Sequence, residues 1–232
     1  NIVGVTEKRT VGGGPSVQAR RASYFGRLGY NYREKYMLNA TFRADGSSKF
    51  QQGNRWGYFP SVSAGWVLSE EGFLANSTNF MDFLKLRVSW GQVGNQNISD
   101  FQYASPMIIT NYDSDSPAGY YLFGTTLGSN LKGAYPGRLA NPSVKWETSE
   151  QINVGVDARF LAARLGLNMD YYIKTTKDWL VEAPILGTAG TGAPFINGGD
   201  VKNTGVELGL NWNDQLGDLR YAIAVNGAYN KN

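Results

Sequence analysis

Apolar and polar residues alternate along much of this chain. In residues 36–45, tyrosine, leucine, alanine and phenylalanine take the even positions, and asparagine, threonine, arginine and aspartate take most of the odd ones. A period of two places these sets on opposite faces of a β-strand. The same alternation occurs in residues 24–33, 58–69, 84–90, 151–160, 164–174, 203–212 and 219–229. The pattern predicts eight antiparallel strands, each with an apolar and a mostly polar face.

Short and long connections alternate between these segments. The short ones are residues 33–35, 161–163 and 213–217, and the long ones are residues 46–57, 91–144 and 175–201. Short periplasmic turns and long extracellular loops are typical of a transmembrane β-barrel.

Two connections need separate interpretation. The link at residues 69–82 is of medium length, and we expect a helical turn after Ser69. The stretch "WGQVGNQN" at residues 90–97 opens the longest connection, and its glycines and amides indicate a turn where the strand ends.

Aromatic residues lie near the ends of the apolar columns, with small aliphatic residues between them. Amphipathic rings favour the two membrane interfaces, whereas a soluble β-sandwich has no reason to place them at both ends. We therefore predict a membrane-interface role for Tyr24, Tyr32, Tyr36, Phe42, Tyr58, Trp66, Trp90, Trp212, Tyr221 and Tyr229. Glu150 also falls in an apolar column, and it fits this interpretation only if its strand extends beyond the membrane.

The composition narrows the function. The 232 residues contain no cysteine and no histidine, so thiolate chemistry, the usual general base and the usual zinc ligands are missing. We expect no enzyme, no metal site and no cofactor. The formal net charge is +3 without a basic run, which gives no indication of nucleic-acid binding. No apolar run is long enough for a transmembrane helix.

Five stretches in order resemble the barrel of the SusC/RagA family of TonB-dependent outer-membrane transporters. They are "SYFGRLGYNYREKYMLNATFRADGSSKF", "NRWGYFPSVSAGWVLSEEGFL", "LKLRVSWGQVGNQNI", "NPSVKWETSEQINVGVDARFL" and "DYYIKTTKDWLVEAPI", and the likeness spans residues 23–229. The resemblance implies a barrel of about 22 strands that encloses a plug domain. It further implies a SusD-like surface lipoprotein, energy from TonB, and import of glycans or peptides.

On this resemblance, residues 1–232 form part of a receptor β-barrel domain in the bacterial outer membrane, in contact with its lipid. We expect the chain itself to lack the plug domain, through which TonB would act, and a signal peptide. Two alternatives remain open from the sequence: a soluble all-β ligand-binding module, and a small eight-stranded outer-membrane adhesin.

The long connections hold the candidate ligand contacts, because loops on a rigid scaffold carry function. Aromatic faces suit sugar rings, and carboxylates suit their hydroxyl groups. The candidates are Tyr103, Tyr112, Asp113, Asp115, Tyr120 and Tyr121, together with Trp56. The alternative is that the loop aromatics pack the loop and that Trp56 anchors the barrel at the interface.

Three other features have plainer interpretations. The two aspartates in "YDSDS", residues 112–116, lack the glycine and glutamate spacing of a calcium loop. The glycine-rich residues 186–199 lack a phosphate-binding motif and indicate a flexible loop. Basic residues in the polar columns would face the barrel interior, where plug contact is favoured over a solute path; they are Arg27, Arg43, Lys85, Arg87 and Lys174.

The assignment of faces can be tested with arginine. Leu38→Arg or Val62→Arg should lower the free energy of unfolding of the intact barrel by about 2–4 kcal/mol, because each position lies near the middle of the predicted lipid-facing surface. Asn39→Arg, on the opposite face, is the control and should cost much less. Urea titration of the full-length protein in lipid vesicles measures the difference, and equal tolerance at positions 38 and 39 would contradict the assignment.

Overall fold

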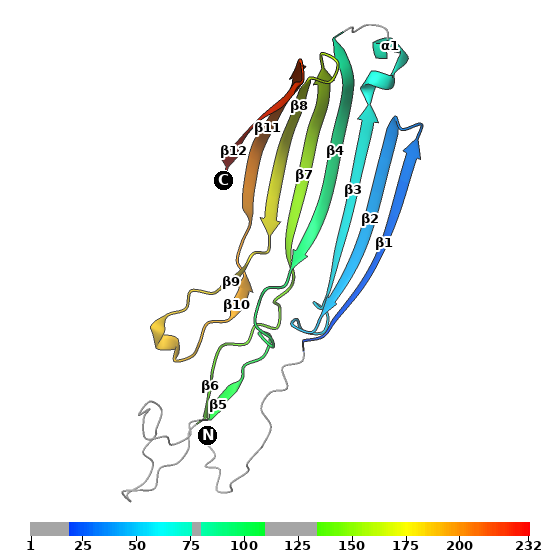
Figure 1. The fold of residues 1–232 in the computed structure, drawn as a ribbon. Helices are drawn as coiled ribbons and strands as arrows, with labels where there is room; N and C mark the ends of the chain where they lie inside the picture. The colour runs from blue at the N-terminus through cyan, green and yellow to red at the C-terminus, as the bar shows by residue number, and fades with distance from the viewer. Residues whose placement is uncertain (1–18, 76–79, 110–133) are drawn as a thin grey trace, which may run out of the picture.

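One large antiparallel sheet dominates the computed structural model, which describes residues 19–75, 80–109 and 134–232 (Figure 1). Its strand order is β1-β2-β3-β4-β7-β8-β11-β12. The strands are β1 (Arg21–Tyr32), β2 (Tyr36–Ser47), β3 (Trp56–Val67), β4 (Met81–Asn95), β7 (Glu147–Phe160), β8 (Leu165–Lys177), β11 (Val201–Leu216) and β12 (Leu219–Lys231). All eight predicted strands are therefore confirmed, and all except β3, which ends at Val67 and not at Ser69, are longer than the predicted alternating segment.

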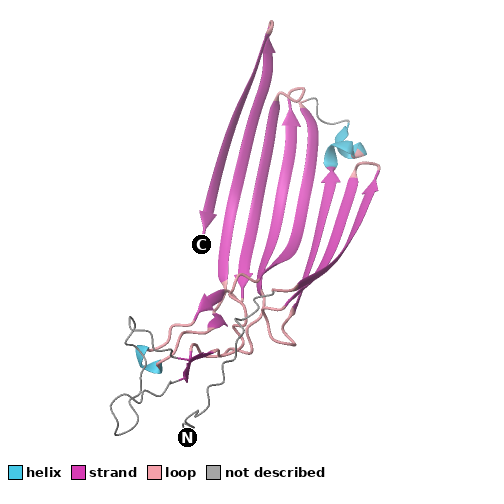
Figure 2. Cartoon of the chain, turned by 60° about the horizontal axis from the view of Figure 1, so that its bottom comes forward, coloured by secondary structure: helices cyan, strands magenta, loops and turns pink. Residues whose placement is uncertain are grey.

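The sheet is open within the described residues. Its two edges, β1 and β12, lie on opposite sides in Figure 2 and do not pair with each other. A closed barrel of eight strands would join these edges through a continuous hydrogen-bonded ladder. The small eight-stranded adhesin considered from the sequence is therefore wrong for this chain.

The connections gather at two ends of the sheet, as Figure 1 shows. We call one the turn end, where residues 33–35, 161–164 and 217–218 join neighbouring strands. The β3–β4 connection also lies there and contains η1 (Leu68–Glu70) and α1 (Gly72–Ala75), so the predicted helical turn after Ser69 is confirmed. We call the other the loop end, because the long connections lie there. The predicted alternation of short and long connections is thus present.

The long connections contain short elements that the alternation did not predict. Strands β5 (Met107–Ile109) and β6 (Ala134–Pro136) form one ribbon, and β9 (Leu180–Glu182) and β10 (Phe195–Asn197) form another. The glycine-rich residues 186–199 include β10 and η2 (Gly187–Ala189), so they are not one structureless loop. In the described part of the chain, no helix has both the length and the apolarity to cross a membrane.

The turn expected at residues 90–97 is wrong for most of that stretch, because β4 continues to Asn95. Pairing between β3 and β4 ends at Ser61 with Gly91, directly before Pro60, which has no N–H to donate to a ladder. A Cβ at Gly91 would come 2.9 Å from the Ser61 Cβ, and a Cβ at Gly94 would overlap the Phe59 ring. The glycines make room for close packing and do not turn the chain.

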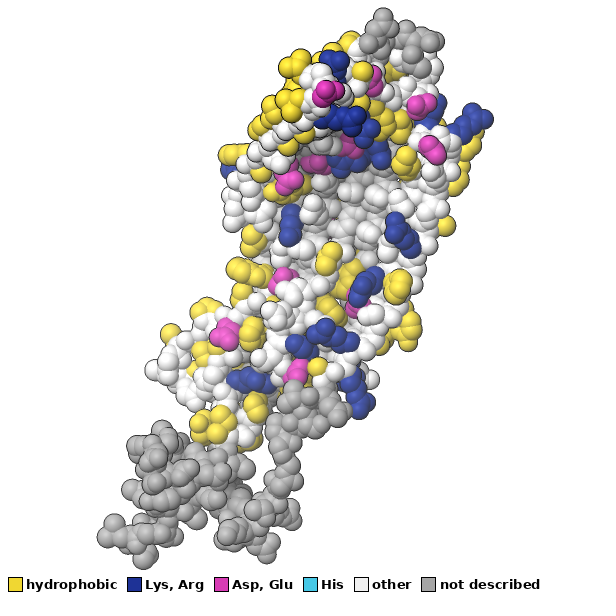
Figure 3. Space-filling view, viewed as in Figure 1, with side chains coloured by type: hydrophobic (Ala, Val, Ile, Leu, Met, Phe, Trp, Pro, Cys, Tyr) yellow, Lys and Arg dark blue, Asp and Glu magenta, His cyan; other side chains and the backbone are white. Residues whose placement is uncertain are grey.

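The strand register keeps apolar residues beside apolar residues. Leu38 pairs with Ala64, Ala64 with Val88, and Val88 with Val154. One residue along, Asn39, Ser63, Ser89 and Asn153 form a polar row in the same way. We call the two surfaces the apolar face and the polar face. In Figure 3 many hydrophobic side chains lie along the rim, and few lie at the centre of the visible face.

Aromatic side chains occupy both ends of the apolar face. At the turn end, Tyr36 stacks between Tyr32 and Trp66, with ring centroids 6.3 Å apart in each pair. Two pairs stack toward the loop end: Tyr24 with Trp56 at 5.9 Å, and Phe42 with Tyr58 at 6.2 Å. Trp90 lies farther from the strand ends and pairs with Val62. Two other aromatics lie toward the turn end, where Trp212 pairs with Leu165 and Tyr221 pairs with Asp214. Tyr229 pairs with Val206. Most of the predicted aromatics thus lie near an end of their column.

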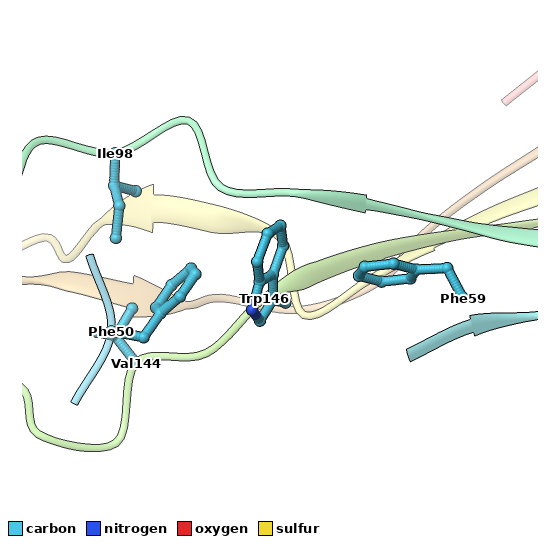
Figure 4. Close-up of a cluster of buried hydrophobic side chains, with 5 residues drawn as sticks. All are labelled: Phe50, Phe59, Ile98, Val144 and Trp146. Carbon is cyan, nitrogen blue, oxygen red and sulfur yellow. The ribbon is translucent and has the colours of Figure 1, made fainter. Parts of the chain in front are cut away.

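The hydrophobic core lies among the long connections (Figure 4). Phe50, Phe59, Ile98, Val144 and Trp146 form this loop-end core, and the side chains of Phe50 and Val144 are fully buried. The Trp146 ring lies 5.3 Å from the Phe50 ring and 5.5 Å from the Phe59 ring, and its Nε1 donates to the Arg55 carbonyl at 2.9 Å. The loop end is therefore packed.

Trp146→Ala tests whether this core holds the long connections together. Loss of the buried ring should destabilise the loop end by about 3–5 kcal/mol, because the neighbouring rings lose their contacts. Hydrogen exchange of the full-length protein should speed up in residues 96–103 and 140–146. Trp56→Ala, which removes a half-exposed ring from the apolar face, is the matched control; equal effects of the two variants in these segments would contradict the packing role.

Candidate functional site

An ionic network lies on the polar face toward the turn end. The Arg87 guanidinium donates from Nε and Nη2 to the two carboxylate oxygens of Asp157, at 2.7 and 2.9 Å. Its Nη2 also donates to Asp170 Oδ2 at 3.0 Å, and Asn168 Nδ2 donates to Asp157 Oδ1 at 2.7 Å. Gly155 pairs with both Arg87 and Asp170 in the register, and a Cβ there would come 2.7 Å from Arg87 Nη2. Because Gly155 has no side chain, the Arg87 guanidinium can lie over this position and reach both aspartates.

Other basic residues predicted for the interior also lie on the polar face and find partners there. Arg43 Nε pairs with Asp45 Oδ2 at 2.6 Å, and Arg27 Nη2 donates to Asn39 Oδ1 at 3.3 Å. Figure 3 shows basic and acidic side chains together across this face. The polar face is therefore a mixed-charge surface.

A pocket of about 320 Å³ opens on the polar face at the loop end. It lies between the end of β2, residues 94–97 and Trp146 of the loop-end core, and its polar lining includes Arg43, Asp45 and Lys49. We call it the loop-end pocket. Trp146 forms its wall and also packs in the core, so the core fixes one side of the pocket.

Two hydrogen-bond acceptors of this pocket have no donor. Asp45 Oδ1 and Gln96 Oε1 are buried and accept no hydrogen bond from the described residues. Lys49, by contrast, donates to the Ile98 carbonyl, and the other Asp45 oxygen is held by Arg43. Because buried acceptors are normally satisfied, the pocket is suited to a ligand that brings donors such as hydroxyl or amide N–H groups.

Neither of the two candidate ligand residues that the structure describes, Tyr103 and Trp56, lines this pocket. Tyr103 packs against the loop-end core and meets the Phe101 ring edge to face at 6.1 Å. Trp56 lies in the apolar column, stacked on Tyr24. These positions favour loop packing for Tyr103 and interface anchoring for Trp56. The remaining candidates, Tyr112, Asp113, Asp115, Tyr120 and Tyr121, lie outside the described residues.

Apart from Arg43, which was predicted to face the barrel interior, sequence reasoning missed the residues that line the pocket. The adjacent amides Asn95, Gln96 and Asn97 were a usable signal, but the glycines beside them led to their interpretation as a turn. Asp45 and Lys49 lie at and just beyond the end of β2, and nothing in the periodicity indicates that they meet residues 94–97.

Glu150 on the apolar face has two partners. Its Oε1 accepts a hydrogen bond from Trp90 Nε1 at 2.9 Å, and its Oε2 pairs with Lys177 Nζ at 2.6 Å. Lys177 is the last residue of β8, so this pair lies toward the loop end. The acidic side chain is accommodated by these contacts. No group of three or more acidic side chains in the described part of the chain could hold a metal ion.

Comparison with known proteins identifies the family. The model of the family "TonB dependent receptor-like, beta-barrel" matches residues 5–232. The TonB-dependent receptor SusC of Bacteroides thetaiotaomicron is 37% identical over 212 residues, which cover 88% of this chain and 20% of SusC. TonB-dependent receptor P26 of Formosa agariphila is 36% identical over 191 residues, covering 82% of this chain and 18% of the receptor.

Solved structures agree with this assignment. The RagAB peptide importer in its closed-closed state matches with a TM-score of 0.76 and 27% identity, over 90% of this chain and 22% of the matched chain. The siderophore receptor PirA of Pseudomonas aeruginosa matches with a TM-score of 0.56 at 17% identity, over 91% of this chain and 34% of PirA, which shows a shared fold only.

The resemblance to SusC and RagA is therefore confirmed, and these curated relatives are receptors by name. The chain spans about a fifth of the length of the curated relatives it matches, between 18% and 20%. In proteins of this kind the apolar face of the sheet meets lipid and the polar face meets the barrel interior. The chain belongs to the TonB-dependent receptor family and forms a segment of a large β-barrel in the outer membrane.

Proposed function

We propose that the intact receptor imports oligosaccharides or peptides across the outer membrane, and that this chain supplies part of its wall and part of its ligand-contacting surface. The observation that carries the proposal is the loop-end pocket, where the buried acceptors Asp45 Oδ1 and Gln96 Oε1 lie without donors. The loop end is the extracellular end of the sheet, because long loops face outward in such barrels. The pocket is thus in position to meet a ligand that arrives from outside.

The chemistry of the pocket supports this class of substrate. Sugar hydroxyl groups and peptide N–H groups are both donors that would satisfy the two acceptors. The charges of Arg43 and Asp45 offset each other, and the neighbouring amides of residues 95–97 can both donate and accept. An uncharged, polar ligand with many hydrogen-bonding groups fits these features. The RagAB complex, to which the chain is similar, is named a peptide importer, which supports peptides as one of the two classes.

The proposal includes two protein partners that the family resemblance implies, a SusD-like lipoprotein and TonB. A SusD-like lipoprotein would cap the loop end, where the loop-end core holds residues 48–55, 96–103 and 140–146 in fixed positions. TonB would act through a plug domain, and the mixed charges of the polar face would contact that plug. The aromatic side chains at the two ends of the apolar face would anchor the wall at the membrane interfaces.

Import is preferred over catalysis and over soluble binding. The relatives are named receptors, and the chain lacks the cysteine and histidine on which many catalytic sites depend. A soluble ligand-binding module, the other alternative from the sequence, does not fit a chain of this outer-membrane family.

Binding by the full-length receptor tests the proposal. The receptor would be purified in detergent from its source membrane with its associated proteins, then exposed separately to a protein digest and to a partial starch hydrolysate. We expect a lipoprotein to co-purify and one of the two mixtures to yield retained components, identified by mass spectrometry. Retention of neither mixture, with no lipoprotein present, would contradict the proposal.

Gln96→Ala tests the pocket itself. Removal of one acceptor should weaken binding of a retained component about 2- to 10-fold, since a net hydrogen bond is worth about 0.5–1.5 kcal/mol. Gln51→Ala is the matched control, because Gln51 is exposed in the β2–β3 connection and does not line the pocket. Titration calorimetry with the full-length protein measures both variants. If the Gln96→Ala variant binds with unchanged affinity, the loop-end pocket is not part of the ligand-binding site.

A further inference from the structure

The β3–β4 connection begins on the apolar face of the barrel wall. After η1, the Glu71 carboxylate accepts hydrogen bonds from Tyr36 Oη at 2.5 Å and Trp66 Nε1 at 3.0 Å, and it pairs with Lys35 Nζ at 3.4 Å. Tyr36 and Trp66 both belong to the apolar columns of their strands and stack on each other. Glu71 therefore ties the connection to the membrane-facing side of the wall.

The same connection also ends on the apolar face. The Phe80 ring stacks on Phe160, with centroids 6.1 Å apart and an interplanar angle of 8°. The Phe80 carbonyl accepts a hydrogen bond from the Leu161 backbone at 3.0 Å. Phe160 ends the apolar column of β7, next to a turn of the same end. Both described ends of the connection thus lie against the outside of the barrel.

Large apolar side chains are exposed beside these anchors. Phe73 in α1 is 66% exposed and Phe80 is 59% exposed. Both belong to the connection that Glu71 and Phe160 hold at the turn end, where Tyr32, Tyr36 and Trp66 form an aromatic row. Apolar surface at this level gains free energy by contact with acyl chains, and short amphipathic segments with aromatic residues lie in the membrane interface for this reason.

Cationic side chains lie at the level of this row. The Arg33 guanidinium is positioned 5.1 Å over the Tyr32 ring, and Lys35 reaches Glu71. Long basic side chains near aromatic rings place their charged ends among lipid headgroups. The hydrogen bonds from Tyr36 and then Trp66, with the Lys35 charge, lower the pKa of Glu71, so its carboxylate stays ionised and bound at neutral pH.

We propose that residues 68–75 and Phe80 form an interfacial anchor that lies in the periplasmic leaflet, with Phe73 and Phe80 at the acyl boundary and Arg33 beside the phospholipid phosphates. The occupant of this exposed apolar surface is the phospholipid itself, because Phe80 extends the apolar column of β7 through Phe160, and Glu71 holds the start of the connection on Tyr36 and Trp66 of the lipid-facing wall. These described residues thereby form a membrane-binding element and do not lie free in the periplasm. The inference rests on the outer-membrane location of the chain and is independent of the transported ligand.

Site-directed spin labelling can measure this depth, and the 232 residues contain no cysteine to interfere. In the full-length receptor, with any cysteine elsewhere replaced, Phe73→Cys would carry a nitroxide in vesicles of phosphatidylethanolamine and phosphatidylglycerol. Leu38→Cys is the lipid-facing control, and Glu34→Cys, exposed in the β1–β2 turn, is the aqueous control at the same end. Collision rates with oxygen and with a water-soluble nickel chelate give the depth of each label.

We expect the label at position 73 to favour oxygen over nickel, as at position 38, whereas the label at position 34 favours nickel. A label at position 73 that behaves like the one at position 34 would overturn the proposal. Low accessibility to both reagents would also overturn it, because a protein would then cover the site. None of these outcomes depends on ligand binding, so failure here leaves the proposed import untouched.

A second variant tests whether Glu71 holds the interfacial anchor against the barrel wall. Glu71→Leu removes the acceptor for Tyr36 and Trp66, and the label at position 73 should then gain contact with nickel. Glu70→Leu, which changes the preceding exposed acidic residue, should leave the depth unchanged. If both variants shift the label equally, Glu71 is not the attachment. If Glu71→Leu fails to fold, the depth measured at position 73 with Glu71 present still decides the proposal.

Discussion

Hydrogen bonding of the backbone in the absence of water is the constraint on which this structure depends. In hydrocarbon each unpaired N–H or C=O costs free energy, so strands must pair along their length and irregular backbone must lie at the ends. The wall from β1 to β12 meets this requirement with antiparallel registers, interrupted by a bulge between Met81 and Phe83 at the turn end of β4. The one early stop, at Ser61 with Gly91, coincides with a proline and lies toward the loop end. Beyond it, Phe59 still pairs with Arg43 of β2, and its side chain enters the loop-end core.

The two ends of the wall use different physical means to order their connections. At the loop end, aromatic and aliphatic side chains from the three long connections and from Phe59 of β3 pack on one another, as in a small globular core. At the turn end, single contacts attach the chain to the outside of the sheet: a carboxylate bound by a phenol and an indole, and one pair of stacked phenyl rings. The loop end can therefore hold a pocket with a defined shape, whereas the turn end presents separate side chains to its surroundings.

The sheet was predicted well from the sequence because the alternation of apolar and polar residues is visible within each strand alone. Residues 36–45 define both faces without reference to any other segment, and the register follows from matching apolar rows. The contacts between distant residues were not predictable in the same way. Lys49 meets the Ile98 carbonyl, and Asp45 shares a pocket with Gln96, across about fifty residues of chain. No local sequence pattern indicates such long-range contacts. A glycine in a turn and a glycine that makes room for a ring, such as Gly94, also cannot be distinguished from the sequence. Five candidate ligand residues, from Tyr112 to Tyr121, lie outside the described residues, so they remain predictions.

Gly155 has a consequence for how this wall can vary between relatives. Arg87 reaches Asp157 and Asp170 across the position where Gly155 has no side chain, so the three charged residues depend on a residue that has no charge. A Cβ at that position would overlap Asp170 Oδ1 and come 2.7 Å from Arg87 Nη2, so one of these two side chains would have to shift. A larger residue at position 155 would therefore need a compensating shift or exchange of Arg87 or Asp170. Substitutions on three neighbouring strands of the barrel are thus coupled through its smallest residue.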